Sequence, residues 1–319
     1  MRKRLTVAFL IGLFCTIFCF LRLVYGTCAG GTCEAGDFTW ALRGAQQLLD
    51  GQNPYHDPTL GPDNPYPYNA PLFYPMPAML VAMPFTPFPR EVAGALFLGV
   101  SCGLLAFGLF REGFGGWPFF LSSSFWFSFM TVQWSPLIVA SALLPALLPI
   151  CTVKPNIGAP VFATHMTRRS VLIAVAVVLG SLLIVPSWPL DWYHNSSQHT
   201  IFMPLFWFPG FLVALAALRW RERGAWLLLL LALVPQRPLY DQLPLWLVRG
   251  PQATRSMLVL SALSWISIFG WLAVPAWTVT WVVIGMYLPA LGVVLWPLAE
   301  ERFSKKKHGK EQQGENHAG

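Results

Sequence analysis

Seven of the chain's 14 acidic residues lie in polar segments that the charge pattern described below assigns to one side of a membrane. These carboxylates are Glu34, Asp37, Asp50, Asp57, Asp63, Asp191 and Asp241. A carboxylate that is held in place can act as a general base, because it takes the proton from a hydroxyl group as the oxygen attacks. Their crowding in a chain with only 11% charged residues indicates chemistry rather than packing.

Asp37 opens the stretch GDFTWALRGAQQLLDGQNPY, which runs from Gly36 to Tyr55. Its apolar residues recur at helical spacing, and they are Phe38, Leu42, Ala45 and Leu49. Its polar residues fall on the other face, and they are Arg43, Gln46, Gln47 and Asp50. The pattern predicts an amphipathic interfacial helix over residues 38–50 that ends at Gly51. Asp37 would then be its N-cap, so the alternative to a catalytic role is that it only caps the helix.

Lys154 is the only lysine between Lys3 and Lys305, and its surroundings are apolar. An unpaired cation at membrane depth is costly and therefore indicates a functional site. We expect Lys154 to bind an anionic group such as a phosphate. The alternative is that its side chain extends to the membrane interface or pairs with helix carbonyls.

Two further polar stretches contain residues that suit a phosphate or sugar site. The stretch VPQRPLYDQ contains Arg237 and Asp241, which can bind phosphate and orient hydroxyl groups or can form an ordinary loop pair. The stretch LDWYHNSSQHT contains His194 and His199 beside Trp192. His194 is a substrate-binding candidate, and the alternative is a solvated loop within an aromatic belt.

Sequence motifs for other chemistries are absent from the chain. There is no His-Glu-x-x-His, paired Cys-x-x-Cys or Asp-x-Asp, so we expect neither a cofactor nor a metal site. There is also no Gly-x-Gly-x-x-Gly, Walker A loop or Gly-x-Ser-x-Gly. Chemistry on a soluble nucleotide is therefore not expected.

The composition places these residues in an integral membrane protein. The 319 residues have a mean hydropathy of +0.54 and are 55% hydrophobic. Most apolar stretches have the roughly 17–25 residues that cross a bilayer as a helix. The sequence therefore predicts an all-α, polytopic helical bundle.

Basic residues at the cytoplasmic ends of the spans explain the formal charge of +7 without a nucleic-acid partner. We expect both termini in the cytoplasm, about 10–12 spans, and external segments at 26–71, 187–200 and 235–242. The transmembrane domain would cover residues 1–302, and a disordered basic tail would cover 303–319. Predicted spans lie near 5–25, 72–88, 92–110, 170–186, 201–218, 225–235, 239–248, 256–272 and 277–298.

Two regions leave alternatives open. The segment 111–169 is broken by several prolines, which predicts short, kinked or re-entrant helices rather than a definite number of spans. Cys28 and Cys33 share the first external loop, where they could form a disulfide or remain free thiols. The first apolar segment lacks a small-x-small cleavage site, so we expect a retained anchor rather than a signal peptide.

The first external loop resembles glycosyltransferase family 87, whose members are membrane enzymes of the GT-C fold. The family pattern is Asp-aromatic, a short helix, Gly-x-x-x-Tyr and then Tyr-x-x-Pro. The matching residues are Asp37-Phe38, Gly51 to Tyr55, and Tyr68 to Pro71. Gln133-Trp134-Ser135-Pro136 resembles the family's Gly-Gln-x-Asn element with both flanking residues changed, and Val153-Lys154-Pro155 resembles its Lys-Pro step. The resemblance fades after about Thr200.

This resemblance implies a function at the external face of the plasma (inner) membrane. The enzyme would move a hexose or pentose, with mannose expected, from a polyprenyl-phosphate donor to a hydroxyl of an envelope glycolipid or glycan. Asp37 would be the general base. Tyr55, Tyr68 and Gln133 would contact substrate together with Lys154. Two other classes remain open, namely a transporter or flippase of a lipid-linked or anionic substrate, and a noncatalytic assembly subunit.

The charge pattern generates a topology prediction. A reporter fused after Asp57 should be external, whereas the same reporter fused after Arg169 should be cytoplasmic, because basic clusters stay inside. Paired fusions to enzymes that are active on only one side of the membrane measure this. A cytoplasmic location for the Asp57 fusion would contradict both the topology and the external site.

Overall fold

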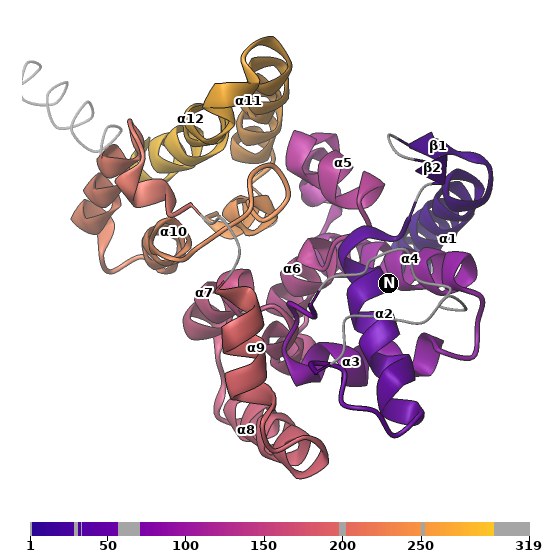
Figure 1. The fold of residues 1–319 in the computed structure, drawn as a ribbon. Helices are drawn as coiled ribbons and strands as arrows, with labels where there is room; N and C mark the ends of the chain where they lie inside the picture. Colours follow the sequence, from indigo (N-terminus) through magenta and orange to yellow (C-terminus); the bar gives the residue numbers. More distant parts are fainter. Residues whose placement is uncertain are drawn as a thin grey trace, which may run out of the picture.

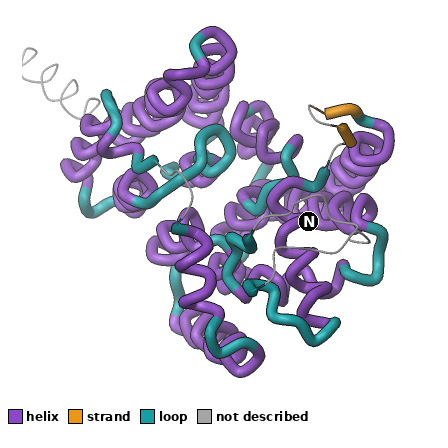
Figure 2. Tube along the Cα trace, in the orientation of Figure 1, coloured by secondary structure: helices purple, strands orange, loops and turns teal. Residues whose placement is uncertain are grey.

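The described chain is almost entirely helical, which confirms the predicted fold class at the level of a helical membrane protein. The computed structural model describes residues 2–28, 31–32, 34–56, 71–197, 202–249 and 253–296. Figure 1 labels the helices, and Figure 2 shows how short loops connect them. One antiparallel pair of two-residue strands, β1 (Thr27–Cys28) and β2 (Gly31–Thr32), follows the first helix.

Four helical stretches in the described residues are long and apolar enough to cross a membrane. They are α1 (Arg2–Tyr25), α4 (Arg90–Phe110), α11 (Thr254–Ala273) and Pro275–Trp296. The last begins with a 3₁₀ turn (Pro275–Trp277), continues as α12 (Thr278–Val282), and contains a π-helical turn (Val283–Tyr287). These helices coincide with four of the predicted spans.

A fifth span is formed if α8 (Arg168–Ile184) and α9 (Trp188–Ser196) belong to one broken span, since the two helices bend by 96°. Other predicted spans correspond to short helices. These are α3 (Met76–Ala82) with the 3₁₀ turn Met83–Phe85, the 3₁₀ helices Pro204–Phe206, Gly210–Arg219 and Leu243–Leu247, and α10 (Arg223–Leu233). Prolines at both ends of α3 shorten it. The predicted total of 10–12 spans therefore stays a prediction.

The middle of the chain is a series of short helices, as its prolines predict. They are the 3₁₀ helix Phe114–Leu121, α5 (Ser123–Met130), α6 (Ser135–Leu143), the 3₁₀ helix Pro145–Val153 and α7 (Pro155–His165). Gln133 lies in the break between α5 and α6, and Lys154 lies in the break before α7. The interruptions thus place both polar side chains at helix ends.

Close packing of α1 against α4 depends on small residues. A Cβ atom added at Gly12 would lie 2.9 Å from the carbonyl oxygen of Gly99, and one added at Gly103 would lie 3.5 Å from Gly12 Cα. Small side chains allow two helix backbones to approach closely within a membrane. Cys15, Cys19, Cys102 and Cys151 are buried free thiols, whereas the alternatives for Cys28 and Cys33 fall outside the side chains that the structure describes.

The predicted helix after the first span is α2 (Gly36–Leu49), and its end at Gly51 is confirmed by a φ of +74° at that glycine. Two details of the prediction are wrong. Ala35 is the N-cap, and Asp37 lies inside the first turn, so its carboxylate is not a cap. Arg43 and Gln47 are only 1% and 6% exposed, so α2 is buried on its polar face as well.

The burial of α2 has a physical reason in its neighbours. The ring of Phe38 stacks on that of Phe97 of α4 with centroids 4.0 Å apart. Gly44 faces Met79 of α3 so closely that an added Cβ would lie 2.7 Å from the sulfur atom. The helix therefore packs within the bundle rather than only on an interface, and this packing fixes the direction of Asp37.

Gly36 generates a test of how Asp37 is positioned. Gly36 and Gly51 both have positive φ, at +40° and +74°, so alanine costs roughly 1–2 kcal/mol at either position. A Cβ at Gly36 would also collide with the carbonyl oxygen of Thr131, whereas nothing lies within 4 Å of a Cβ at Gly51. Gly36→Ala should therefore lower the melting temperature of the purified protein more than Gly51→Ala. Equal losses would contradict this account.

Candidate functional site

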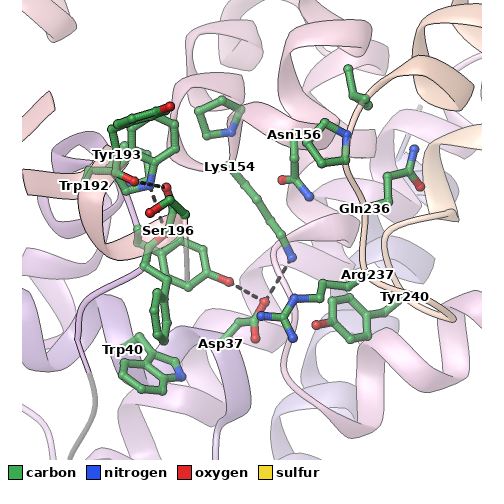
Figure 3. Close-up of a pocket in the computed structure, with 17 residues that line it drawn as sticks. Asp37, Trp40, Lys154, Asn156, Trp192, Tyr193, Ser196, Gln236, Arg237 and Tyr240 are labelled. Carbon is green, nitrogen blue, oxygen red and sulfur yellow. Dashed lines mark hydrogen bonds and ion pairs between the residues drawn. The ribbon is translucent and has the colours of Figure 1, made fainter. Parts of the chain in front are cut away.

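A cavity of about 790 Å³ lies where the predicted external segments meet. Its walls come from α2, from residues 73–75, from the start of α7, from α9 and from residues 234–240. Figure 3 shows that the labelled side chains of these segments converge. Segments more than 100 residues apart in sequence thus form one site.

The centre of the site is a lysine between two carboxylates. Lys154 Nζ lies 3.0 Å from Asp37 Oδ2 and 2.8 Å from Asp241 Oδ1. It also donates a hydrogen bond of 3.3 Å to Gln133 Oε1, and it lies 4.8 Å from the ring centroid of Tyr240. The prediction that Lys154 is an unpaired cation is therefore wrong, because burial of the lysine is compensated by two anions.

Asp37 is the carboxylate of this cluster that reaches the cavity, and its side chain is 21% exposed. Tyr74 and Lys154 both donate hydrogen bonds to its Oδ2 atom. Burial raises the pKa of Asp37, but the charge of Lys154 and hydrogen bonds from Tyr74, Lys154 and Gln133 outweigh burial and leave the pKa below its ordinary value. Asp37 is therefore ionised at neutral pH.

Asp241 is fully buried beneath the cavity. Its Oδ2 atom accepts hydrogen bonds of 2.8 Å from Asn156 Nδ2 and 2.9 Å from the backbone N–H of Arg237. The expected Arg237–Asp241 pair thus exists through the main chain of the arginine. The guanidinium of Arg237 instead lines the cavity. No described residue forms an ion pair or hydrogen bond with the guanidinium, since the hydrogen bonds of Arg237 involve its backbone.

The loop that contains Arg237 is held by a dense set of hydrogen bonds. The carbonyl oxygen of Tyr240 accepts from Ser128 Oγ at 3.3 Å and from Ser135 Oγ at 2.9 Å. Gln242 Nε2 donates to the Arg237 carbonyl oxygen at 3.0 Å. This rigid loop fixes where the guanidinium enters the cavity.

Strained backbone occurs beside the site residues. Val132 has a φ of +46° and precedes Gln133, while Leu239 has a φ of +79° and precedes Tyr240. Such angles are uncommon for residues with a Cβ atom and cost of order 1–3 kcal/mol, so surrounding contacts must enforce them. Strain next to these two residues is consistent with a site in which side-chain direction matters.

Aromatic side chains form one wall of the cavity. The ring centroids of Trp40 and Phe73 are 5.2 Å apart. Trp192 of α9 donates its indole N–H to the carbonyl oxygen of Phe73 at 3.0 Å, which joins α9 to this wall. Tyr74 and Tyr193 also line the cavity. An aromatic wall near charged groups suits a ligand that has both an apolar face and an anionic group.

Several predicted site residues lie elsewhere. His194 is exposed on α9 and does not line the cavity. Tyr55 is buried, and its hydroxyl donates to the carbonyl oxygen of Tyr74 at 2.8 Å, so it supports the wall from behind. Tyr68 lies outside the described residues. Asp191 accepts a hydrogen bond from Ser187 at 2.7 Å, lies 3.3 Å from His56 Nε2 and does not line the cavity.

The sequence interpretation missed other cavity residues, namely Trp40, Tyr74, Asn156, Gln236 and Tyr240. Asn156 follows the Lys154-Pro155 step directly, and Tyr74 lies in the Tyr-rich entry to α3, so position next to a motif was the available signal. Their side-chain directions depend on tertiary contacts, which composition and periodicity do not contain.

Comparisons of the chain with protein-family models, with curated proteins and with solved structures find no match. No cluster of three or more His, Cys, Asp or Glu side chains in the described ranges is placed to hold a metal ion.

The lysine cluster generates a stability prediction. Lys154→Met should cost roughly 3–5 kcal/mol, because it leaves the fully buried carboxylate of Asp241 without its cation. Arg219→Met is the matched control, since it breaks an ion pair with the exposed Glu222 and should cost less than about 1 kcal/mol. Thermal unfolding of the two purified variants measures both effects. A Lys154→Met protein as stable as the control would contradict the assigned role of the ion cluster.

Proposed function

We propose that the chain is a membrane glycosyltransferase that uses a polyprenyl-phosphate sugar donor, with Asp37 as the general base. The observation that carries the proposal is that one cavity contains both an ionised carboxylate and a guanidinium, that of Arg237, with which no described residue pairs. That cavity lies among the segments that the charge pattern assigns to the external side. The long apolar helices support a membrane location.

The proposed reaction is a direct displacement at the anomeric carbon. An acceptor hydroxyl attacks this carbon, a new carbon–oxygen bond forms, and the bond from the anomeric carbon to the phosphate oxygen breaks with its electron pair. Asp37 takes the hydroxyl proton, and the prenyl phosphate leaves as an anion. Direct displacement implies inversion at the anomeric carbon. General-base assistance of this kind contributes roughly 10²–10⁴ in rate.

The cations of the site suit the phosphate of such a donor. The guanidinium of Arg237 faces the cavity and can donate two parallel hydrogen bonds to phosphate oxygens. The N-terminal end of α7 borders the same cavity at Pro155 and Asn156, and helix N-termini attract anions. Lys154 contributes positive potential, although its charge is shared with two carboxylates.

The aromatic wall suits the sugar of the donor. Apolar faces of pyranose rings pack on flat side chains, and Trp40, Phe73 and Trp192 provide such a surface. A hexose or pentose fits the available volume of about 790 Å³ together with its phosphate. Within the proposal, mannose is the expected sugar, glycosyltransferase family 87 the expected family, and an envelope glycolipid or glycan the expected acceptor.

A carrier for a lipid-linked anion is the second candidate. A lysine between two carboxylates at a break between short helices is an arrangement that transporters also use at their binding sites. A carrier moves its substrate across the membrane without breaking the sugar–phosphate bond. The fate of that bond therefore separates the two functions.

Asp37 generates the decisive test of the proposed function. Asp37→Asn keeps an oxygen that can accept from Tyr74 and Lys154 but cannot act as a base, so turnover should fall roughly 10²–10⁴-fold. Asp50→Asn, at the exposed end of the same helix, should leave turnover unchanged. Transfer of labelled mannose from farnesyl phosphate mannose to membrane glycolipids measures turnover at matched protein levels.

Two outcomes contradict the proposal, one in this transfer assay and one in a transport assay with proteoliposomes. Turnover of the Asp37→Asn protein within a few-fold of wild type would remove Asp37 as the base. Movement of intact farnesyl phosphate mannose across proteoliposomes, with no transfer of mannose, would support the carrier instead.

A further inference from the structure

Asn156 lines the cavity, and the orientation of its side-chain amide is determined by the neighbouring Asp241. Its Nδ2 atom lies 2.8 Å from Oδ2 of Asp241. An ionised carboxylate can only accept hydrogen bonds, so the NH₂ group of the amide must face Asp241. The carbonyl oxygen of Asn156 must then point away from Asp241, and no described residue donates to it.

Asp241 holds this orientation firmly. The carboxylate is fully buried, and it is fixed by the ion pair with Lys154 Nζ at 2.8 Å and by two hydrogen bonds, from the Arg237 N–H at 2.9 Å and from Asn156 itself. Asn156 also lies in the first turn of α7, directly after Pro155, where its backbone has little freedom. Turning the amide around would place its carbonyl oxygen against a buried anion, which is unfavourable.

Two other polar side chains of the cavity, those of Gln236 and Tyr74, are engaged with the protein. Gln236 Oε1 accepts from Gln242 Nε2 at 2.9 Å and from the Tyr287 hydroxyl at 2.7 Å, and its Nε2 donates to the Leu231 carbonyl oxygen. Tyr74 donates to Asp37. Asn156 therefore offers a neutral acceptor whose direction is fixed and whose lone pairs are free of described partners.

A neutral acceptor beside cations recognises a specific kind of ligand group. A phosphate would be repelled by the carbonyl oxygen, whereas a hydroxyl group can donate to it. Arg237, whose backbone N–H shares the same oxygen of Asp241, supplies the complementary donors for an anion. Asn156 is therefore suited to a hydroxyl-bearing part of the ligand, and Arg237 is suited to an anionic part.

We propose that Asn156 contacts the sugar of the ligand, with its amide carbonyl oxygen accepting a hydrogen bond from a sugar hydroxyl, and that Asp241 is the positioning residue that fixes this orientation. The inference rests on the proposed function, since it names the residue that recognises the sugar in that reaction. The sugar is either that of the donor or that of the acceptor, and both present the same hydroxyl chemistry.

The test compares the binding of three probes to the full-length protein in nanodiscs. Farnesyl phosphate mannose carries both sugar and phosphate, farnesyl phosphate lacks the sugar, and octyl α-mannoside lacks the phosphate. Asn156→Ala should weaken one or both mannosides about 3- to 10-fold, the value of one neutral hydrogen bond, and leave farnesyl phosphate unchanged. Arg237→Gln should weaken both phosphate probes.

The two sugar sources are separated by the pattern of loss. A loss confined to farnesyl phosphate mannose assigns the contact to the donor sugar, and a loss confined to octyl α-mannoside assigns it to the acceptor. Unchanged affinity of the Asn156→Ala protein for both mannosides would overturn the inference while the proposed function stands. Failure of the wild-type protein to bind any of the three probes would instead overturn the proposed function.

Two further variants separate recognition from folding. Asn156→Ser keeps a hydroxyl that can donate toward Asp241 but lacks the carbonyl oxygen. Its affinity for the mannosides should therefore fall as much as that of the Asn156→Ala protein. Gln46→Ala removes another amide–carboxylate hydrogen bond, the 3.2 Å contact to Asp50 outside the cavity, and should bind all three probes as wild type does. Full mannoside affinity in the serine variant would contradict the role of the carbonyl oxygen.

The positioning role of Asp241 has its own readout. In Asp241→Asn the new amide can donate to Asn156, which allows the amide of Asn156 to turn around. If Asn156 contacts the donor sugar, the ratio of the affinities for farnesyl phosphate mannose and farnesyl phosphate should then fall about 3- to 10-fold. If Asn156 contacts the acceptor sugar, the affinity for octyl α-mannoside should fall by the same factor. A purely structural role would weaken all three probes equally and would overturn this assignment.

Discussion

The structure around the cavity depends on the need to compensate one buried lysine. Lys154 is only 7% exposed in a chain rich in apolar residues, and an isolated ammonium group there would be strongly unfavourable. Asp37 and Asp241 supply the compensating charges at 3.0 and 2.8 Å. The first comes from α2 and the second from the loop after α10, so the ion cluster joins distant parts of the chain at the start of α7.

This compensation has a chemical consequence for Asp37. The cation and the hydrogen bonds that keep the carboxylate ionised also stabilise its charged form, which makes it a weaker base. Asp241 limits this effect because it shares the cation. A ligand phosphate near Arg237 and Lys154 would draw positive potential away from Asp37. In the proposed reaction, the charge of the ligand would thus be coupled to the basicity of the carboxylate without any change of fold.

A polar site within apolar helices also needs breaks in the helices. Prolines interrupt the helices of the region 111–169, including Pro155 at the first position of α7. Backbone at positive φ follows α5 and precedes Tyr240. The carbonyl of Tyr240 illustrates the compensation, since two serine hydroxyls donate to it. Irregular backbone in a membrane protein must find such partners, because lipid provides none. The hydrogen bonds to backbone groups at these helix breaks also give the cavity a fixed shape.

The sequence by itself determined the membrane class, several helices and the residues that could do chemistry. Hydropathy located α1, α4 and α11, and the helical period located α2, because these signals are local along the chain. The scarcity of charge made Asp37, Lys154, Arg237 and Asp241 stand out. Only the tertiary structure decided that Lys154 is paired, that Asp37 lies within the first turn instead of capping it, and that Asn156 faces the cavity. Pairing, burial and amide orientation depend on atoms contributed by segments more than 80 residues apart, and no local pattern encodes which of those segments meet.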